Sequence, residues 1–224
     1  MKITFLGQAG LLFEKNGFKI MTDPYLSNSV EKINPKNYRR VSVDEGFWDV
    51  KPDVMIFTHN HLDHYDPETA KRFLSADSPI LVLAPGSVWN EVRKIGGNHN
   101  YVLFNRHTSW TEKGIKFTAV KAAHSDETAV GVLIDDGEKK YYITGDTLYN
   151  EEIFADIPQD ITAVFLPING AGNNMNMSDA KAFAERIGAK YTVPIHFGMF
   201  DEINADAFEC DNKVIPKIYK EIEL

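Results

Sequence analysis

The segment from residue 57 to residue 64 has the greatest density of reactive side chains in the chain. His59, His61, Asp63 and His64 place three imidazoles and a carboxylate within six positions, directly after the apolar run 54–57. Such donors at the end of one strand need little backbone rearrangement to converge on a metal ion. The alternative is a polar loop with scattered histidines, in which each ring needs its own hydrogen-bond partner. We therefore expect half of a two-metal site here.

Three further side chains follow predicted strands and could supply the other half. These are His124, Asp146 and His196. Ligands at the ends of separate strands can point into one crevice of an α/β protein, although any one of them alone would more often be a structural residue. His99 and His107 lack this strand-end context, and we interpret both as turn or surface residues.

The elements that position these residues follow from turn chemistry and hydrophobic patterning. An antiparallel meander is predicted for the first 23 residues, and residues 24–50 are predicted to form a long loop without sustained periodicity. The remaining predicted strands are 54–57, 80–84, 101–104, 107–111, 115–121, 129–134, 140–144, 163–166 and 191–195.

Helix signals lie between these strands. Asp66 followed by Pro67 is typical of an N-cap and first helical position, and a second helix is expected to open after Pro85. Ser178 is the expected N-cap of a helix that ends at Gly188, and two final helices are predicted at 205–210 and 218–222. Two runs of sheet, each followed by helices, favour an α/β fold with four layers, an αββα sandwich, in a single domain spanning residues 1–224.

Composition excludes several classes of partner. The net charge of −8, with no basic cluster beyond Arg39 and Arg40, argues against nucleic acid, so a small-molecule substrate is expected. No apolar run is long enough for a membrane helix, and we predict no membrane association. The single cysteine, Cys210, excludes an intrachain disulfide, and the first residues form a strand pattern rather than a signal peptide; a cytoplasmic location is expected. The sequence does not predict the oligomeric state.

The order His-x-His-x-Asp-His, then His, Asp and His, resembles the signature of the metallo-β-lactamase superfamily. The resemblance implies that superfamily's αββα sandwich and two divalent metal ions. By this resemblance one metal is held by His59, His61 and His124, the second by Asp63, His64 and His196, and Asp146 bridges both. Imidazoles and carboxylates suit Zn²⁺ best, and also Mn²⁺ or Fe²⁺.

This ligand set predicts a hydrolase. Two cations about 3.5 to 4 Å apart would hold a bridging water as hydroxide near neutral pH and polarise the scissile group. Asp63, with one carboxylate oxygen free, is the predicted catalytic residue that orients the hydroxide and passes its proton to the leaving group.

Within the superfamily, the chain resembles the L-ascorbate-6-phosphate lactonase-like branch. Class B β-lactamases typically have cysteine at the position of Asp146, and the other branches considered need a basic arm or an additional domain. The likeness lies in the segments 5–10, 22–27, 58–64, 145–147 and 194–200. It implies a small ester, a lactone or a phosphorylated sugar derivative as substrate. The alternatives are a phosphodiesterase or phospholipase-like hydrolase and, outside enzymes, a metal-bound sensing or binding protein.

Four features could shape the substrate pocket. The 167–177 segment is glycine-rich, and Asn169 and Asn174 in it are candidate substrate-binding residues for an anionic group, unless the segment is only a long turn. The 24–50 loop could form a pocket wall, and Lys121 is either an anion contact or a solvated lysine. The apolar segment 197–200 could line the pocket or pack against the C-terminal region.

Overall fold

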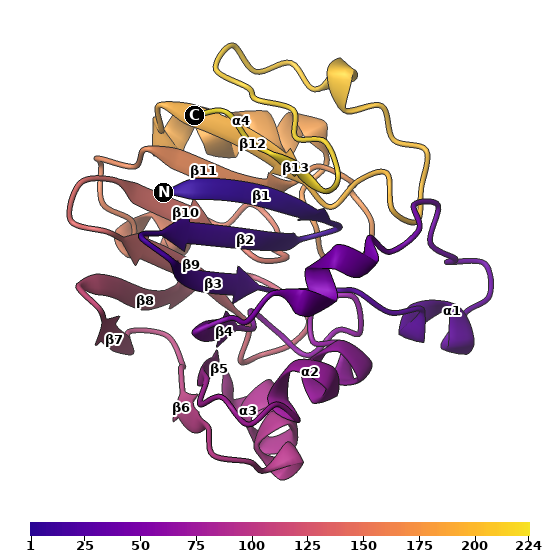
Figure 1. Cartoon of the computed structure of the whole chain (residues 1–224). Helices are drawn as coiled ribbons and strands as arrows, with labels where there is room; N and C mark the ends of the chain where they lie inside the picture. Colours follow the sequence, from indigo (N-terminus) through magenta and orange to yellow (C-terminus); the bar gives the residue numbers. More distant parts are fainter.

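The computed structural model describes residues 1–224 and contains two β-sheets with helices on their outer faces (Figure 1). The first sheet has the order β13-β1-β2-β3-β4-β5-β6, and the second has the order β12-β11-β10-β9-β8-β7. The strands of the first sheet are β1 (Lys2–Gly7), β2 (Gly10–Lys15), β3 (Phe18–Thr22), β4 (Val54–Ile56), β5 (Leu81–Ala84), β6 (Asn100–Leu103) and β13 (Lys220–Glu221). Those of the second are β7 (Ser109–Glu112), β8 (Ile115–Lys121), β9 (Val130–Asp135), β10 (Lys140–Ile143), β11 (Ala163–Pro167) and β12 (Tyr191–Ile195).

The helices are few and short. The α-helices are α1 (Ser29–Ile33), α2 (Pro67–Leu74), α3 (Gly86–Val92) and α4 (Met177–Ile187). Four 3-10 turns complete the set: η1 (Glu45–Asp49), η2 (Arg93–Ile95), η3 (Glu151–Ala155) and η4 (Ala205–Ala207). No helix has the length and apolar character required to cross a lipid bilayer.

Three separate apolar clusters hold the layers together and confirm the predicted four-layer arrangement. The central cluster combines inward-facing residues of both sheets, such as Phe13 and Phe165, whose rings make an edge contact at 5.8 Å. A second cluster joins the outer face of the first sheet to α2 and α3, and a third joins the second sheet to α4. Burial of apolar surface on both faces of each sheet stabilises this packing.

In each sheet most strands run in the same direction, so their carboxyl ends lie along one end of that sheet. In the first sheet β3, β4, β5 and β6 are parallel, and β1 runs the same way because two antiparallel steps separate it from β3. In the second sheet β10, β11 and β12 are parallel, and β8 runs the same way. The carboxyl ends of these strands are where ligand sites of open sheets form.

The predicted meander and the cap of α2 are confirmed, whereas three other local predictions are wrong. Asp66 accepts hydrogen bonds from the backbone of Glu68 and Thr69, as an N-cap does. The N-cap of α4 is Asn176 rather than Ser178, because the Asn176 side chain accepts from the Asp179 amide at 3.0 Å.

The predicted C-terminal helices are the second wrong prediction, and the continuous loop is the third. Residues 205–207 form only the 3-10 turn η4, and residues 220–221 form strand β13 on the edge of β1. The predicted loop 24–50 contains α1 and η1, although the rest of it is irregular.

Candidate metal centre

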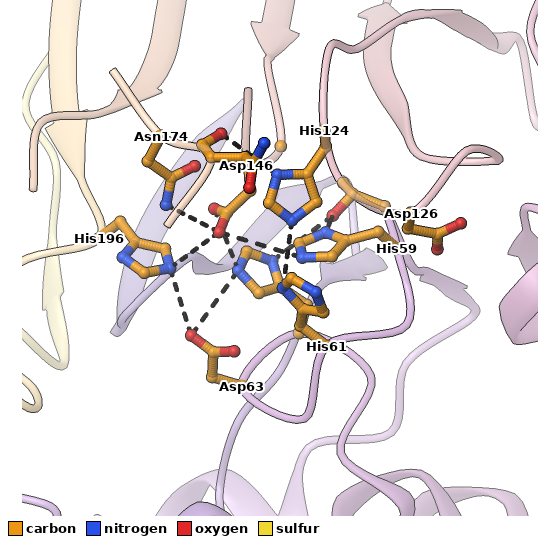
Figure 2. Close-up of polar contacts among 12 residues, drawn as sticks. His59, His61, Asp63, His124, Asp126, Asp146, Asn174 and His196 are labelled. Atoms are coloured by element: carbon orange, nitrogen blue, oxygen red, sulfur yellow. Dashed lines mark hydrogen bonds and ion pairs between the residues drawn. The ribbon is translucent and has the colours of Figure 1, made fainter. Parts of the chain in front are cut away.

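The seven side chains singled out from the sequence converge in one cluster at the shared edge of the two sheets (Figure 2). They arrive on loops that follow β4, β8, β10 and β12. Their ligand atoms form two groups, each with all atoms within 4.8 Å of one another: His59, His61, His124 and Asp146 in one group, and Asp63, His64 and His196 in the other.

The first group brings three imidazoles together. His124 Nε2 lies 3.1 Å from His61 Nδ1, and the ring centroids of His59 and His124 are 4.5 Å apart. His59 is fully buried, and its Nε2 atom has no hydrogen-bond partner. A buried nitrogen without a partner is costly, and a cation at the centre of these rings would satisfy it.

The second group brings one carboxylate and two imidazoles together. His196 Nε2 lies 3.2 Å from Asp63 Oδ2, and His64 Nε2 lies 3.9 Å from the same oxygen. His64 is fully buried and His196 is 6% exposed, so their rings are shielded from water. Imidazole nitrogens and a carboxylate oxygen at this spacing form a donor set that divalent cations such as Zn²⁺ accept.

Asp146 touches both groups. Its Oδ1 atom lies 3.1 Å from His64 Nε2, and its Oδ2 atom lies 3.2 Å from His196 Nε2 and 4.0 Å from His59 Nε2. Figure 2 shows its carboxylate between the His59–His61–His124 side and the Asp63–His196 side. Gly145 permits this placement, because its φ of +63° is one that other residues rarely adopt.

The two groups differ in their electrostatics. Burial lowers the pKa values of His59 and His124, which favours neutral rings with free lone pairs. Burial also disfavours charge on His64 and His196, but the neighbouring carboxylates outweigh it: the pKa of His64 is raised well above its usual value, and that of His196 is raised to about 9. The second group therefore attracts positive charge, whether protons or a cation.

Residues around the candidate ligands hold them in place by hydrogen bonds. Two of these supporting residues, Asp23 and Gln8, were given no role by the sequence analysis. Asp23, fully buried after β3, accepts from His64 Nδ1 at 2.8 Å and from the Thr58 amide at 2.8 Å. Gln8, after β1, donates from Nε2 to Asp63 Oδ2 at 2.8 Å. Both residues lie just beyond a strand end, and this position is the signal that could have identified them.

Asn174 is another of these supporting residues. Its amide nitrogen donates to Asp146 Oδ2 at 2.8 Å, and the residue is 5% exposed. Asn169 lines the cavity above the cluster and makes no hydrogen bond to a predicted ligand. The neighbouring Asn173 carbonyl lies 3.2 Å from His124 Nδ1, so the 169–174 segment contacts two members of the first group, Asp146 and His124.

The cavity above the cluster has a volume of about 330 Å³ and a polar lining. Five amide side chains, three carboxylates and two aromatic or small apolar residues surround the histidines: Gln8, Asn37, Asn169, Asn173, Asn174, Asp63, Asp146, Asp201, Phe200 and Ala171. No lysine or arginine lines it. A larger cleft, about 590 Å³, lies beside Trp48 and Arg72 but contains no histidine.

Few of the other residues that the sequence analysis considered for the pocket line the cavity. Within the 24–50 segment only Asn37 lines the cavity, and within 197–200 only Phe200 does, while Met199 is fully buried. Lys121 is not part of the lining, and its side chain pairs with Glu152. His99 is a partly buried structural residue that accepts from the Ile80 amide.

His107 is exposed in the turn before β7, and its Nε2 atom lies 3.1 Å from Asp156 Oδ1. Neither it nor His99 belongs to the two groups of candidate ligands. The interpretation as a turn or surface residue agrees with the position of His107, whereas His99 is partly buried and both of its ring nitrogens have backbone partners.

The four layers, with this cluster at one edge, are those of the metallo-β-lactamase fold. The family model of the beta-lactamase superfamily domain matches residues 2–196, and the chain belongs to this family. It is also similar, at 32% identity over 95% of this chain and 92% of the relative, to a protein of Carboxydothermus hydrogenoformans named UPF0173 metal-dependent hydrolase.

Solved structures share the fold at low sequence identity. Igni18, a metallo hydrolase from the archaeon Ignicoccus hospitalis, superposes with a TM-score of 0.78 at 18% identity, covering 98% of this chain and 96% of its own. The isothiocyanate hydrolase from Delia radicum gut bacteria has a TM-score of 0.75 at 18% identity, covering 100% and 99%. At this identity the likeness establishes the fold alone.

Proposed function

We propose that the chain is a metal-dependent hydrolase that binds two divalent cations and cleaves a small ester or lactone. The observation that carries the proposal is the convergence of seven donor side chains in two groups joined by Asp146. His59, His61 and His124 would hold one cation, Asp63, His64 and His196 the second, and Asp146 both. When bound, such cations supply Lewis acidity and lower the pKa of water, with Zn²⁺ the best match to this donor set.

The buried polar atoms of the cluster support the fit of two cations. His59 Nε2 is buried without a hydrogen-bond partner, and the buried atoms His64 Nε2 and Asp146 Oδ1 face only each other, at 3.1 Å, so the three atoms span both groups. Each such atom costs about 1 to 3 kcal/mol if it stays unsatisfied. Cations bound to these atoms would remove that cost.

Asp63 has the geometry expected of the residue that moves a proton. Its contacts with Gln8, His64 and His196 all involve Oδ2, so Oδ1 is available to a reacting group. The Asp63 side chain is 20% exposed and lines the cavity, where a substrate can reach it. We assign to Asp63 the orientation of the attacking water and the transfer of its proton to the leaving oxygen.

The cavity lining favours a small, polar substrate. Its volume of about 330 Å³ suits a small molecule, and its amide side chains can both donate to and accept from hydroxyl groups. Asn169 and Asn174 would contribute to this recognition. Any negative charge on the substrate would have to lie at the reacting group, near the cations, because no lysine or arginine lines the cavity. A sugar-derived lactone meets these requirements, in keeping with the resemblance to the lactonase-like branch.

A substrate panel tests the proposal. Metal-free protein is reconstituted with Zn²⁺ or Mn²⁺ and assayed on lactones, thioesters and phosphodiesters, with the Asp63→Asn variant as control. We expect lactone or ester turnover that Asp63→Asn abolishes even at metal concentrations that saturate both subsites of the variant. Turnover of phosphodiesters with inert lactones would overturn the substrate class, and full activity of Asp63→Asn would overturn the role of Asp63.

A further inference from the structure

Gln8 occupies an unusual position between two candidate ligands of the second group. The residue follows β1, is 2% exposed, and has a left-handed backbone conformation with φ +53°. Its carbonyl oxygen accepts from the His196 amide at 2.6 Å, and His196 is itself left-handed with φ +60°. Two non-glycine residues in this conformation, bonded to each other, are strained in a way that sites of function often retain.

The side chain of Gln8 contacts Asp63 and His196 at the same time. Its Nε2 atom donates to Asp63 Oδ2 at 2.8 Å. The same nitrogen is 3.1 Å from His196 Nδ1 and 3.0 Å from His196 Nε2. A donor in the plane of the ring is close to only one ring nitrogen, so these nearly equal distances place the amide over the face of the imidazole. The in-plane lone pair of His196 Nε2 therefore remains free for a cation.

The chemistry of the carboxylate fixes which end of the amide faces the cluster. Ionised Asp63 can only accept, so the amide nitrogen must point toward it and the carbonyl oxygen must point away. That oxygen, Oε1, is buried and has no hydrogen-bond partner. Leaving it unpaired costs about 1 to 3 kcal/mol, a cost that a purely structural residue would not need to carry.

We propose that Gln8 is a positioning residue for the second cation subsite. The Gln8 amide fixes the rotamer of Asp63, so that Oδ2 faces the cation and Oδ1 stays available. The same amide packs against the face of the His196 ring and fixes the orientation of that ring. The inference rests on the proposed function, in which Asp63, His64 and His196 bind a cation. Gln8 makes no hydrogen bond to His59, His61 or His124, so the effect is confined to one subsite.

Stepwise metal binding tests this assignment without a substrate. Chelator-treated protein is titrated with Zn²⁺ against a chromophoric competitor, and both binding steps are fitted for wild type, Gln8→Met, Gln8→Ala and Asn212→Ala. Met has a similar length and keeps the contact with the His196 face, but cannot donate. Asn212 is a matched control, because its partly buried amide donates to the Ala189 carbonyl at 2.7 Å, outside the cluster.

We expect Gln8→Met and Gln8→Ala to weaken one binding step by about 10- to 100-fold and to leave the other unchanged. Asn212→Ala should bind both cations as wild type does. Wild-type affinities in Gln8→Met, or an equal loss in both steps together with a lower melting temperature, would overturn the assignment. If Gln8→Met does not fold, Gln8→Asn, which shortens the amide by one methylene, carries the same test. Uptake of fewer than two cations by wild type would overturn the proposed function and this inference together.

Discussion

Asp23→Asn is the substitution that most sharply separates a metal centre from a merely polar core. Asp23 is fully buried and accepts three hydrogen bonds: from the Thr58 amide at 2.8 Å, from Thr58 Oγ1 at 2.5 Å and from His64 Nδ1 at 2.8 Å. Because His64 Nδ1 donates to this carboxylate, Nδ1 keeps its proton when Nε2 loses its own to bind a cation. The His64 Nε2 lone pair is then directed into the second group.

Asparagine keeps the shape of the side chain but replaces one oxygen with a donor. If its oxygen continues to accept from the Thr58 amide, its NH₂ group faces His64 Nδ1, which must then accept. The ring proton moves to Nε2, the atom proposed to bind the cation. Loss of such a carboxylate–histidine contact typically costs 10- to 100-fold in metal affinity. Loss of the charge-assisted bond should also cost about 1.5 to 3 kcal/mol in the free energy of unfolding.

Two measurements follow this variant. Zn²⁺ titration reports the affinity of the second subsite, and urea unfolding of the metal-free protein reports stability. Asp53→Asn is the matched control, because the exposed Asp53 carboxylate accepts from the Lys19 amide at 2.8 Å on the surface. Wild-type Zn²⁺ affinity in Asp23→Asn would refute the reasoning from the His64 tautomer.

Three further outcomes are expected. His61→Ala should abolish metal-dependent turnover while the circular dichroism spectrum stays that of the folded protein, because His61 is exposed and the sheets have their own cores. Gly145→Ala should lower the melting temperature and weaken metal binding, since φ is +63° and a Cβ there would lie 3.0 Å from its nearest neighbours, beside Asp146. The Arg106 hydrogen bonds hold the pKa of Asp156 at about 2, below the value near 4 of the unfolded chain. The pair therefore stabilises the fold fully above pH 4, and this stabilisation is lost as the pH falls toward 2. Urea midpoints of wild type and Asp156→Asn should therefore converge between pH 5 and pH 2, and parallel curves would contradict the pairing.

The cluster could be predicted from the sequence because strand ends are local features. A run of apolar residues followed by histidine or aspartate identifies a side chain at the edge of a sheet, and parallel strands bring such edges together. His124 and His196 are 72 positions apart and were still placed in one crevice by this rule. The layer order followed from the same patterns of strand and helix.

The supporting residues Gln8 and Asp23 also follow strand ends, but what they contact could not be predicted in the same way. The role of Gln8 depends on a left-handed turn and on the approach of His196 from the other sheet, which no local pattern records. The C-terminal segment shows the same limit. Its apolar spacing suggested a helix, but Ile222 is buried in the central cluster and Glu221 pairs with Thr4 at the edge of β1. Tertiary packing overrides weak helix propensity in such short segments.

Anomalous diffraction from crystals grown with Zn²⁺ tests the central claim most directly. The proposed function predicts two anomalous peaks about 3.5 to 4 Å apart, one on either side of the Asp146 carboxylate. His59, His61 and His124 should surround one peak, and Asp63, His64 and His196 the other. A single peak, or no peak within this cluster, would contradict a two-metal hydrolase.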